Sequence, residues 1–268
     1  MKLIPILLTL GMLTAVGSAE DVMQQSYSPE LVKKAEAGDA EAQSELGMCY
    51  FRGKGVTKDY EEAVKWWTKA AERGYARAQS ALGARYYWGE GVTQDRKAAV
   101  KWYTKAAEQG DEGAQFCLAN CYFFGNGVTK DKKEAVKWYT KAAEQGDATA
   151  QSSLAMCYEF GTGVTEDKKE AVKWWQKSAE QGIAFAQFRL GLSYAKGAEV
   201  TKDLKEAVKW FTKAAEQGYA DAQFHLASCY ALGQGVTKDE KEAVKWCTKA
   251  AEQGDEEAKK QLETLKSK

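Results

Sequence analysis

Residues 125–146 read GNGVTKDKKEAVKWYTKAAEQG, and with small changes this stretch occurs six times in the 268-residue chain. Its closing glycine returns at a constant interval of 36 residues, at Gly38, Gly74, Gly110, Gly146, Gly182, Gly218 and Gly254. A fixed period of this size, without insertions, is typical of a solenoid built from stacked supersecondary units. We therefore predict an all-α solenoid in which the recurring stretch is the scaffold.

Each unit reads as two helices joined by a Gly-x-Gly turn. In the first unit, Asp39 and Asp59 stand where an aspartate caps the start of a helix, and Glu62 completes a capping-box pattern. Leu46 and its equivalents lie on one face of the first helix, four residues from other apolar positions. Trp66 and its equivalents recur in the second helix, where we expect them to fill the space between units.

Two repeat positions are occupied by small residues in most or all units, which indicates tight packing or a special backbone conformation there. Residue 47 and its equivalents are always Gly or Ala, which predicts that a neighbouring helix packs closely there. In the turn, the fifth unit has Glu199 where the other units have glycine. If that position has a positive φ, Glu199 either carries strain or remodels its turn.

The expected layout is one solenoid over residues 29–268. A half-unit helix precedes six full units, and a polar lone helix closes the C-terminal end. The units are 38–73, 74–109, 110–145, 146–181, 182–217 and 218–253, followed by a cap at 254–268.

The first 19 residues have the pattern of a secretory signal peptide. Lys2 precedes an apolar run from Leu3 to Val16, and small residues stand before a cleavage site after Ala19. The run is short for a membrane span, which needs about 20 apolar residues. We expect an exported protein, periplasmic or secreted, with no stable membrane anchor after cleavage and with a flexible arm at residues 20–28.

The units resemble the Sel-1-like repeat family, a relative of the tetratricopeptide repeats. In the second unit the matching residues are Ala78, Leu82, Gly83 and Tyr86, then Gly89, Gly91, Val92 and Asp95, then Ala99, Trp102, Tyr103, Lys105, Ala106, Ala107 and Gly110. The resemblance covers residues 29–266 and implies a right-handed α/α superhelix with an adaptor role in protein–protein contact. The matched residues are structural, so it carries over no catalytic residue.

Composition argues against some classes of function. The chain has 38 basic and 38 acidic residues, whereas a nucleic-acid-binding surface needs a basic excess or stripe. Clustered metal ligands such as CxxC do not occur in the sequence. We therefore expect no nucleic acid partner, no metal, no cofactor and no catalytic residue.

The six cysteines are spaced unfavourably for disulfides. Cys49, Cys121, Cys157 and Cys229 occupy one repeat position, and equivalent residues of stacked units should lie about 8–10 Å apart. A disulfide needs Cα atoms within about 7 Å. We expect most cysteines to be small buried fillers, and Cys229 with Cys247 is the one pair whose bonding remains open.

An alternative function also comes from the family resemblance. Some secreted, cysteine-rich members have been linked to β-lactam binding or hydrolysis, and they pair a cysteine late in one unit with one early in the next. Here those positions hold alanines such as Ala107 and glutamines such as Gln115. A secreted β-lactam-linked hydrolase or small-molecule binder is therefore the alternative, with His225 beside Ser228 and Cys229 as a conceivable catalytic pair.

The first helix of each unit varies along one face, at residues 41, 45, 48 and 52 of the first unit and their equivalents. In α-solenoids this helix commonly lines the concave side, where ligands bind. The candidate partner-binding residues are Trp88, Asn120, Phe124, Met156, Phe160, Phe185, Arg189, Leu192 and His225. Alternatively, the aromatic members pack beneath the next unit, and the sequence leaves both interpretations open.

We therefore expect an exported scaffold that binds a protein or peptide on its concave face, without chemistry of its own. A bacterial factor that acts on host cells would show the same sequence features. The repeat sequence does not distinguish an exported bacterial scaffold from a bacterial factor that acts on host cells.

Overall fold

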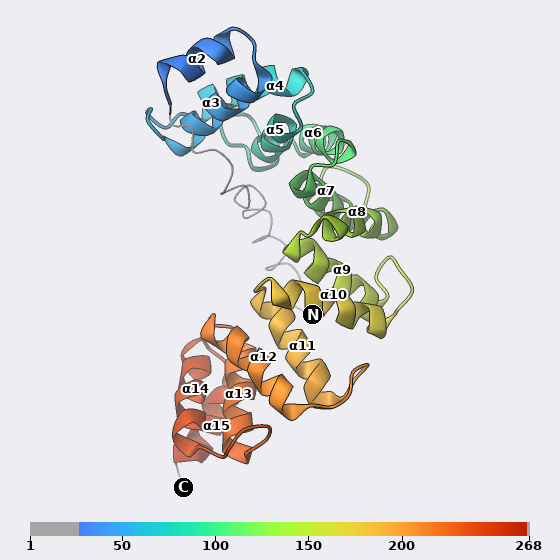
Figure 1. Ribbon diagram of the computed structural model, residues 1–268, viewed down its shortest axis with the longest axis vertical. Helices are drawn as coiled ribbons and strands as arrows, with labels where there is room; N and C mark the ends of the chain where they lie inside the picture. Colours follow the sequence, from blue (N-terminus) through green and yellow to red (C-terminus); the bar gives the residue numbers. More distant parts are fainter. Residues whose placement is uncertain (1–26, 267–268) are drawn as a thin grey trace. The chain divides into compact units, whose positions relative to one another are not determined.

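The computed structural model describes residues 27–266, and these form fourteen α-helices and no strand (Figure 1). The expected signal peptide lies outside the described residues, as does most of the expected arm. Of that arm, Tyr27 packs edge-on against Tyr50, with ring centroids 6.1 Å apart. Ser28 caps the first helix by accepting a hydrogen bond from the Leu31 N–H at 3.1 Å. Tyr27 and Ser28 therefore belong structurally with the repeats.

The helices fall into two compact units, one ending at Ala150 and the other beginning at Gln151. The first contains α2 (Pro29–Glu36), α3 (Ala40–Arg52), α4 (Tyr60–Glu72), α5 (Ala76–Trp88), α6 (Arg96–Glu108), α7 (Glu112–Phe124) and α8 (Lys132–Gln145). The boundary falls within α9 (Ala148–Phe160). The second contains α10 (Lys168–Glu180), α11 (Ala184–Lys196), α12 (Leu204–Glu216), α13 (Ala220–Leu232), α14 (Glu240–Glu252) and α15 (Glu256–Lys266).

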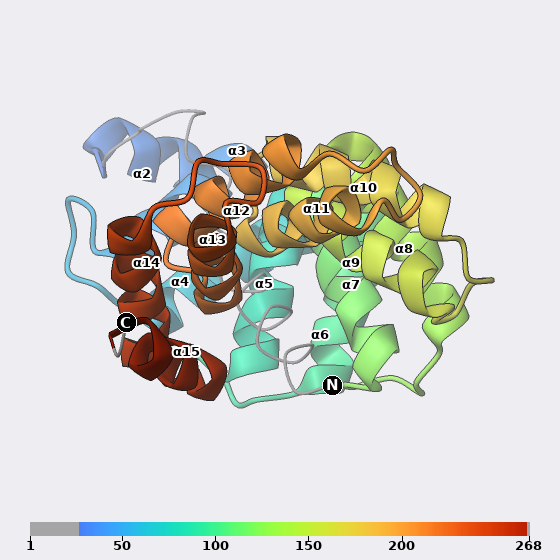
Figure 2. The ribbon, with the colours of Figure 1, turned by 90° about the horizontal axis from the view of Figure 1, so that it is seen from below.

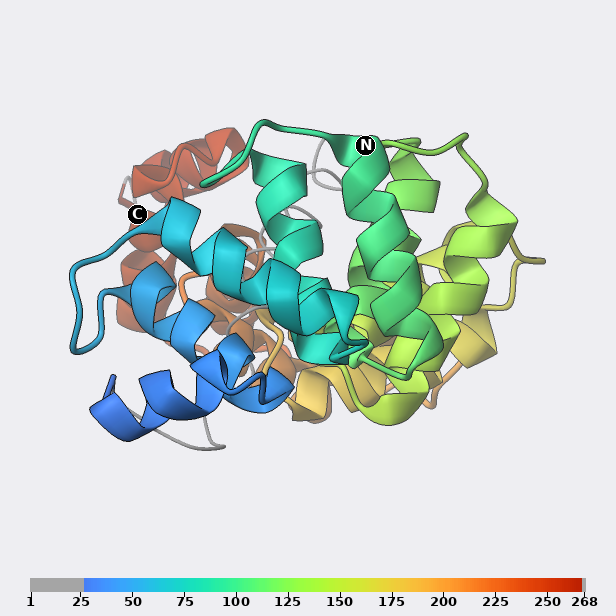
Figure 3. The same ribbon diagram turned by 90° about the horizontal axis from the view of Figure 1, so that it is seen from above.

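Within each unit, consecutive helices pack against one another. In the first unit, α3 pairs with α4, α5 with α6 and α7 with α8, and α2 lies against α3 (Figure 3). In the second, α11 pairs with α12, α13 pairs with α14, and the terminal α15 lies against α14 (Figure 2). This arrangement confirms the predicted all-α architecture of helix–turn–helix repeats with half-repeat ends.

The helix starts follow the predicted aspartate caps, with one correction. Asp39 accepts from the Ala42 N–H at 2.8 Å, and Asp59 accepts from the Glu62 N–H at 2.9 Å. Glu62 does not complete a capping box, because the backbone N–H of Asp59 already donates to the carbonyl of Tyr50 at 2.9 Å. The Glu62 carboxylate instead pairs with the Lys65 ammonium at 2.8 Å.

The small residue in the first helix allows the two helices of a repeat to approach closely. A Cβ built on Gly47 would lie 2.7 Å from the Trp67 Nε1. Trp67 is buried, and so are its equivalents in the other five repeats. Trp66 has a different role: it packs with Leu31 of α2 and Leu46 of α3. Trp66 therefore joins its repeat to the preceding helix, as predicted.

Within each unit, buried glutamines connect a repeat to the helix before it. The Gln79 Nε2 of α5 donates to the carbonyl of Ala71 in α4 at 3.0 Å, and the Gln79 Oε1 accepts from the Gln109 side chain at 2.7 Å. The equivalent Gln115 makes the same pair of bonds, to Ala107 and Gln145. This recurring ladder satisfies carbonyl groups at the ends of the second helices.

The turn at Glu199 keeps the left-handed conformation of its glycine equivalents. Its φ is 63°, against 71° for Gly235 and 70° for Gly91. A Cβ on Gly235 would overlap the backbone carbonyl of Leu204, and one on Gly91 would overlap that of Tyr60. Glu199 therefore carries the strained conformation, and its Cβ needs room that these glycine turns do not provide.

Candidate functional site

The variable face of the first helices is buried in part, and its burial differs between repeats. In the described residues, five of the six middle positions of the second, third and fourth repeats are buried, namely Ala81, Ala84, Cys117, Asn120 and Ser153. Within each unit, α3, α5, α7, α11 and α13 each pack against the second helix of their own repeat and against the helix before them. Part of the variation on this face therefore lies in the core rather than on the surface.

Two of the candidate binding residues are core residues, and the expectation that they form surface is corrected. Asn120 is 0% exposed, and its Oδ1 accepts from the Tyr139 hydroxyl at 2.6 Å. Phe185 is buried, with its ring edge-on to Trp175 at 5.3 Å and to Tyr219 at 6.1 Å. Asn120 compensates for the hydroxyl that Tyr139 brings into the core, and Phe185 fills space between repeats.

The position of the variable face that is most often exposed is its final one, the last residue of each first helix. We call the six residues at this position the helix-end residues: Arg52, Trp88, Phe124, Phe160, Lys196 and Leu232. Trp88 is 39% exposed, Phe160 56% and Leu232 67%, and these are the exposed large hydrophobic residues of the described chain. Phe124 is half-buried and stacks edge-on against Phe123 at 5.0 Å.

The helix-end position is exposed because the first helix ends there. A glycine in the left-handed conformation follows in each case, with φ of 75° for Gly89 after Trp88 and 67° for Gly233 after Leu232. The chain then turns away, so that the final side chain has little covering it. Hydrophobic residues at this position therefore remain in contact with water.

In the second unit, Arg189 brings charge next to Phe160. Its guanidinium lies 5.8 Å from the Phe160 ring centroid and forms an ion pair with Glu159. Burial lowers the pKa of Arg189, and the neighbouring Tyr219 raises it. Met156 and Leu192 are half-buried. This part of α9 and α11 therefore presents an exposed aromatic ring beside a paired guanidinium.

The only histidine is held in an aromatic cluster. The His225 ring lies 5.2 Å from Phe188 and 5.5 Å from Phe211, and its Nδ1 is 2.8 Å from the carbonyl oxygen of Asp221. The Ser228 hydroxyl donates to the carbonyl of Phe224 at 3.1 Å. Ser228 also accepts from the Gln261 Nε2 at 3.2 Å, and its hydroxyl and the His225 ring each bond to a backbone carbonyl rather than to one another, which gives no support to a catalytic pair.

The six cysteines are buried and none is in a disulfide, so Cys229 and Cys247 are not bonded to one another. Burial raises the pKa of Cys121 to about 12 and raises that of Cys117 further. The Cys247 thiol donates to the carbonyl of Ala258 at 3.0 Å. The cysteines are thus small core residues, as the spacing predicted. Between residues 27 and 266, no group of three or more His, Cys, Asp or Glu side chains is placed to hold a metal ion.

One buried arginine was not predicted from the sequence. Arg85 occupies the repeat position of the cysteines, yet its guanidinium is enclosed and lies 4.2 Å from the Phe51 ring centroid. It pairs with Glu90 at 2.8 Å, and burial lowers its pKa. A charged residue at a repeat position otherwise held by Cys or Ser is the signal that could have identified it.

None of the helices in the described range is long and apolar enough to cross a membrane.

Comparison with known proteins places these repeats in a family. The model of the Sel1 repeat matches residues 40–75, 76–111, 113–147, 148–183, 184–219 and 220–255. A Sel1 repeat protein from Oxalobacter formigenes is 38% identical, with a TM-score of 0.76, over 98% of this chain and 76% of that one. These matches extend over nearly all of the described residues.

Two relatives come from Escherichia coli. The c5321 protein, a protective antigen of uropathogenic strains with an SLR fold, is 44% identical with a TM-score of 0.83, over 87% of this chain. The secretory immunoglobulin A-binding protein EsiB, from an O6:H1 strain, is 49% identical over 41 residues, which are 15% of this chain. The chain covers 50% of the antigen's length and 8% of EsiB.

Proposed function

The chain belongs to the Sel1 repeat family, and on that premise we propose that it is an exported scaffold that binds a protein or peptide partner through its helix-end residues. It has no chemistry of its own in this proposal. The apparent signal peptide at residues 1–19 supports export, and the E. coli antigen, a relative by sequence and fold, is consistent with it.

One observation carries the proposal. The exposed large hydrophobic residues of the described chain are Trp88, Phe160 and Leu232, and all three occupy one repeat position. Single exposed hydrophobics are ordinary on protein surfaces, but their restriction to one register is not expected from chance exposure. Because Trp88 lies in the first unit and the other two in the second, each unit has its own candidate contact residues.

Residues found at the helix-end position of other repeats are suitable substitutions for Trp88, Phe160 and Leu232. Arg52 and Lys196 occupy the helix-end position in the first and fifth repeats, so a long basic side chain is compatible with the fold there. The test variant therefore carries Trp88→Arg, Phe160→Lys and Leu232→Lys together. We expect its helical circular dichroism and its Tm to match those of the native chain.

Secretory immunoglobulin A is the first defined ligand to test, because the local relative EsiB is named for binding it. Surface plasmon resonance with immobilised mature chain should give saturable binding that falls at least tenfold in the triple variant. If this ligand fails, cross-linking in native extracts followed by mass spectrometry identifies partners, scored by their loss from the triple variant. A partner retained equally by both proteins would exclude the helix-end residues as the binding surface.

A further inference from the structure

The second repeat lacks a carboxylate that the other five repeats share. The second helix of each of those repeats has a glutamate near its start that pairs with the lysine three residues later. The pairs are Glu62–Lys65 at 2.8 Å, Glu134–Lys137 at 2.7 Å, Glu170–Lys173 at 2.7 Å, Glu206–Lys209 at 2.7 Å and Glu242–Lys245 at 2.8 Å. In α6 the glutamate is replaced by Ala98, and Lys101 makes no ion pair among the described residues.

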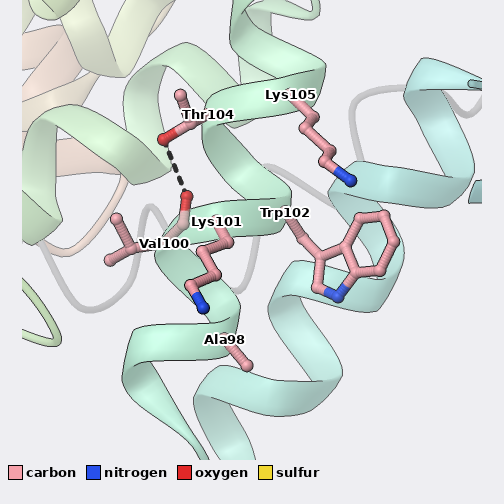
Figure 4. Close-up of a pocket in the computed structure, with 6 residues that line it drawn as sticks. All are labelled: Ala98, Val100, Lys101, Trp102, Thr104 and Lys105. Atoms are coloured by element: carbon pink, nitrogen blue, oxygen red, sulfur yellow. Dashed lines mark hydrogen bonds between the residues drawn. The ribbon is translucent and has the colours of Figure 1, made fainter.

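The missing side chain is associated with a hollow on the surface of α6. Its volume is about 410 Å³, and its lining is Ala98, Val100, Lys101, Trp102, Thr104 and Lys105 (Figure 4). Trp102 is half-buried, whereas its five equivalents are buried. The hollow therefore exposes an indole that the other repeats cover.

The charges around this hollow favour an anion. The Lys105 ammonium lies 4.4 Å from the Trp102 ring centroid, and Lys101 is the second cation of the lining. The first turn of α6 holds no acidic residue, and it begins with the exposed Arg96 and Lys97. A cluster of one sign of charge beside an apolar wall attracts an oppositely charged group.

The sixth repeat shows how a carboxylate fits such a site. In α14, Glu242 accepts from the Lys245 ammonium at 2.8 Å and from the Trp246 Nε1–H at 3.1 Å. Lys101 and Trp102 are the equivalents of Lys245 and Trp246, with the same donors and no carboxylate between them. Hydrogen bonds from two such donors to an ionised acceptor are among the stronger ones in proteins.

We propose that this hollow binds a glutamate or aspartate side chain of a partner polypeptide, which supplies the carboxylate that α6 lacks. The carboxylate accepts from Lys101 and from the indole N–H of Trp102. The residues that flank it in the partner lie against the apolar surface of Ala98 and Trp102. This site is independent of the helix-end residues, because it lies on a second helix rather than at the end of a first.

The test uses the full mature chain, labelled with ¹⁵N, and two blocked tripeptides, acetyl-Leu-Glu-Leu-amide and acetyl-Leu-Gln-Leu-amide. The indole N–H signal of Trp102 is assigned with Trp102→Phe among the nine tryptophans. We expect this signal to shift saturably with the glutamate peptide, and binding to be at least tenfold weaker with the glutamine peptide. Added salt should weaken the response to the glutamate peptide.

Two variants test whether the missing glutamate creates the site, one by adding it to α6 and one by removing its equivalent from α8. Ala98→Glu restores the side chain present in the other five repeats, so it should fold normally and weaken binding of the glutamate peptide at least tenfold. Glu134→Ala removes the corresponding carboxylate from α8, and the Trp138 signal should then respond to the glutamate peptide as Trp102 does. Helix-end variants should leave both responses unchanged.

Several results would overturn the proposal. Equal shifts with both peptides, or an unchanged response in Ala98→Glu, would show that no carboxylate is recognised. A Trp138 signal that stays fixed in Glu134→Ala would show that the missing carboxylate does not create the site. A Trp102 response to phosphatidylserine vesicles but not to the glutamate peptide would assign the hollow to lipid instead.

Discussion

Glu199 shows the cost that a single side chain adds to a repeated turn. Among residues 27–266 it is the one residue other than glycine with a positive φ, and the five equivalent positions hold glycine. The left-handed conformation costs roughly 1–2 kcal/mol for a residue with a Cβ. A glycine avoids that cost, but it also increases the conformational entropy of the unfolded chain. This second effect lowers the free energy of unfolding by about 0.4–1 kcal/mol.

We expect Glu199→Gly to raise the free energy of unfolding by about 1 kcal/mol, measured by urea denaturation. Ala198→Gly is the matched control, because Ala198 lies in the same turn without a positive φ. That control should be neutral or destabilising. Equal stability of Glu199→Gly and the native chain would mean that the turn at Glu199 is not strained.

The six buried cysteines should be unreactive in the folded protein. The thiolate is the reactive form, and burial raises the pKa of Cys121 to about 12, so its thiolate is scarcely populated between pH 7 and 9. In that range, titration with a chromogenic disulfide reagent should show no fast-reacting thiol in the native chain. Six should react after unfolding in denaturant without reductant. Fewer than six would reveal a disulfide that the structure does not contain.

At the scale of the helical element, the glutamine ladder is incomplete at one repeat. In the first repeat Arg73 stands at the position of Gln109, and its Nη1 donates to the carbonyl of Gly38 at 2.7 Å. The Gln43 Oε1 is consequently buried without a hydrogen-bond partner. A buried acceptor left unsatisfied costs about 1–3 kcal/mol.

Arg73→Gln should therefore raise the free energy of unfolding by about 1 kcal/mol, since its amide can donate to Gln43 as Gln109 does to Gln79. Gln109→Ala makes the opposite change at the next repeat, and we expect a loss of about 1–2 kcal/mol. Urea denaturation measures both. A destabilising Arg73→Gln would show that the bond to Gly38 outweighs the unsatisfied oxygen of Gln43.

Some features of the helices could be predicted from the sequence, and others could not. The period, the aspartate caps and the small residue at Gly47 are local signals, and each predicted its structural role. The variable face was ambiguous because variation there also arises when facing core residues vary together. Tyr139 places a hydroxyl in the core and Asn120 accepts from it, so that Asn120 differs from its equivalents Ala84 and Met156 without any ligand.

At the scale of the whole chain, the repeat makes stability nearly a sum of local terms. Within each unit, a repeat is joined to the one before it by contacts that recur with the period: a tryptophan such as Trp66, and a glutamine such as Gln79 that reaches the preceding Ala71 carbonyl. If residues 74–109 are deleted, Gln115 takes the place of Gln79 beside Ala71. The new junction therefore restores the same contacts rather than creating a foreign surface.

We expect this deletion to leave a folded, soluble chain with unchanged helicity per residue. Its urea m-value should fall by about one seventh, in proportion to the surface removed. Deleting only residues 92–109 is the matched control, because it places two first helices in succession and removes the partner of α5. That control should lose cooperative unfolding. If the 36-residue deletion behaved as badly as the control, stability would depend on contacts beyond neighbouring repeats, and the additive description of this solenoid would be wrong.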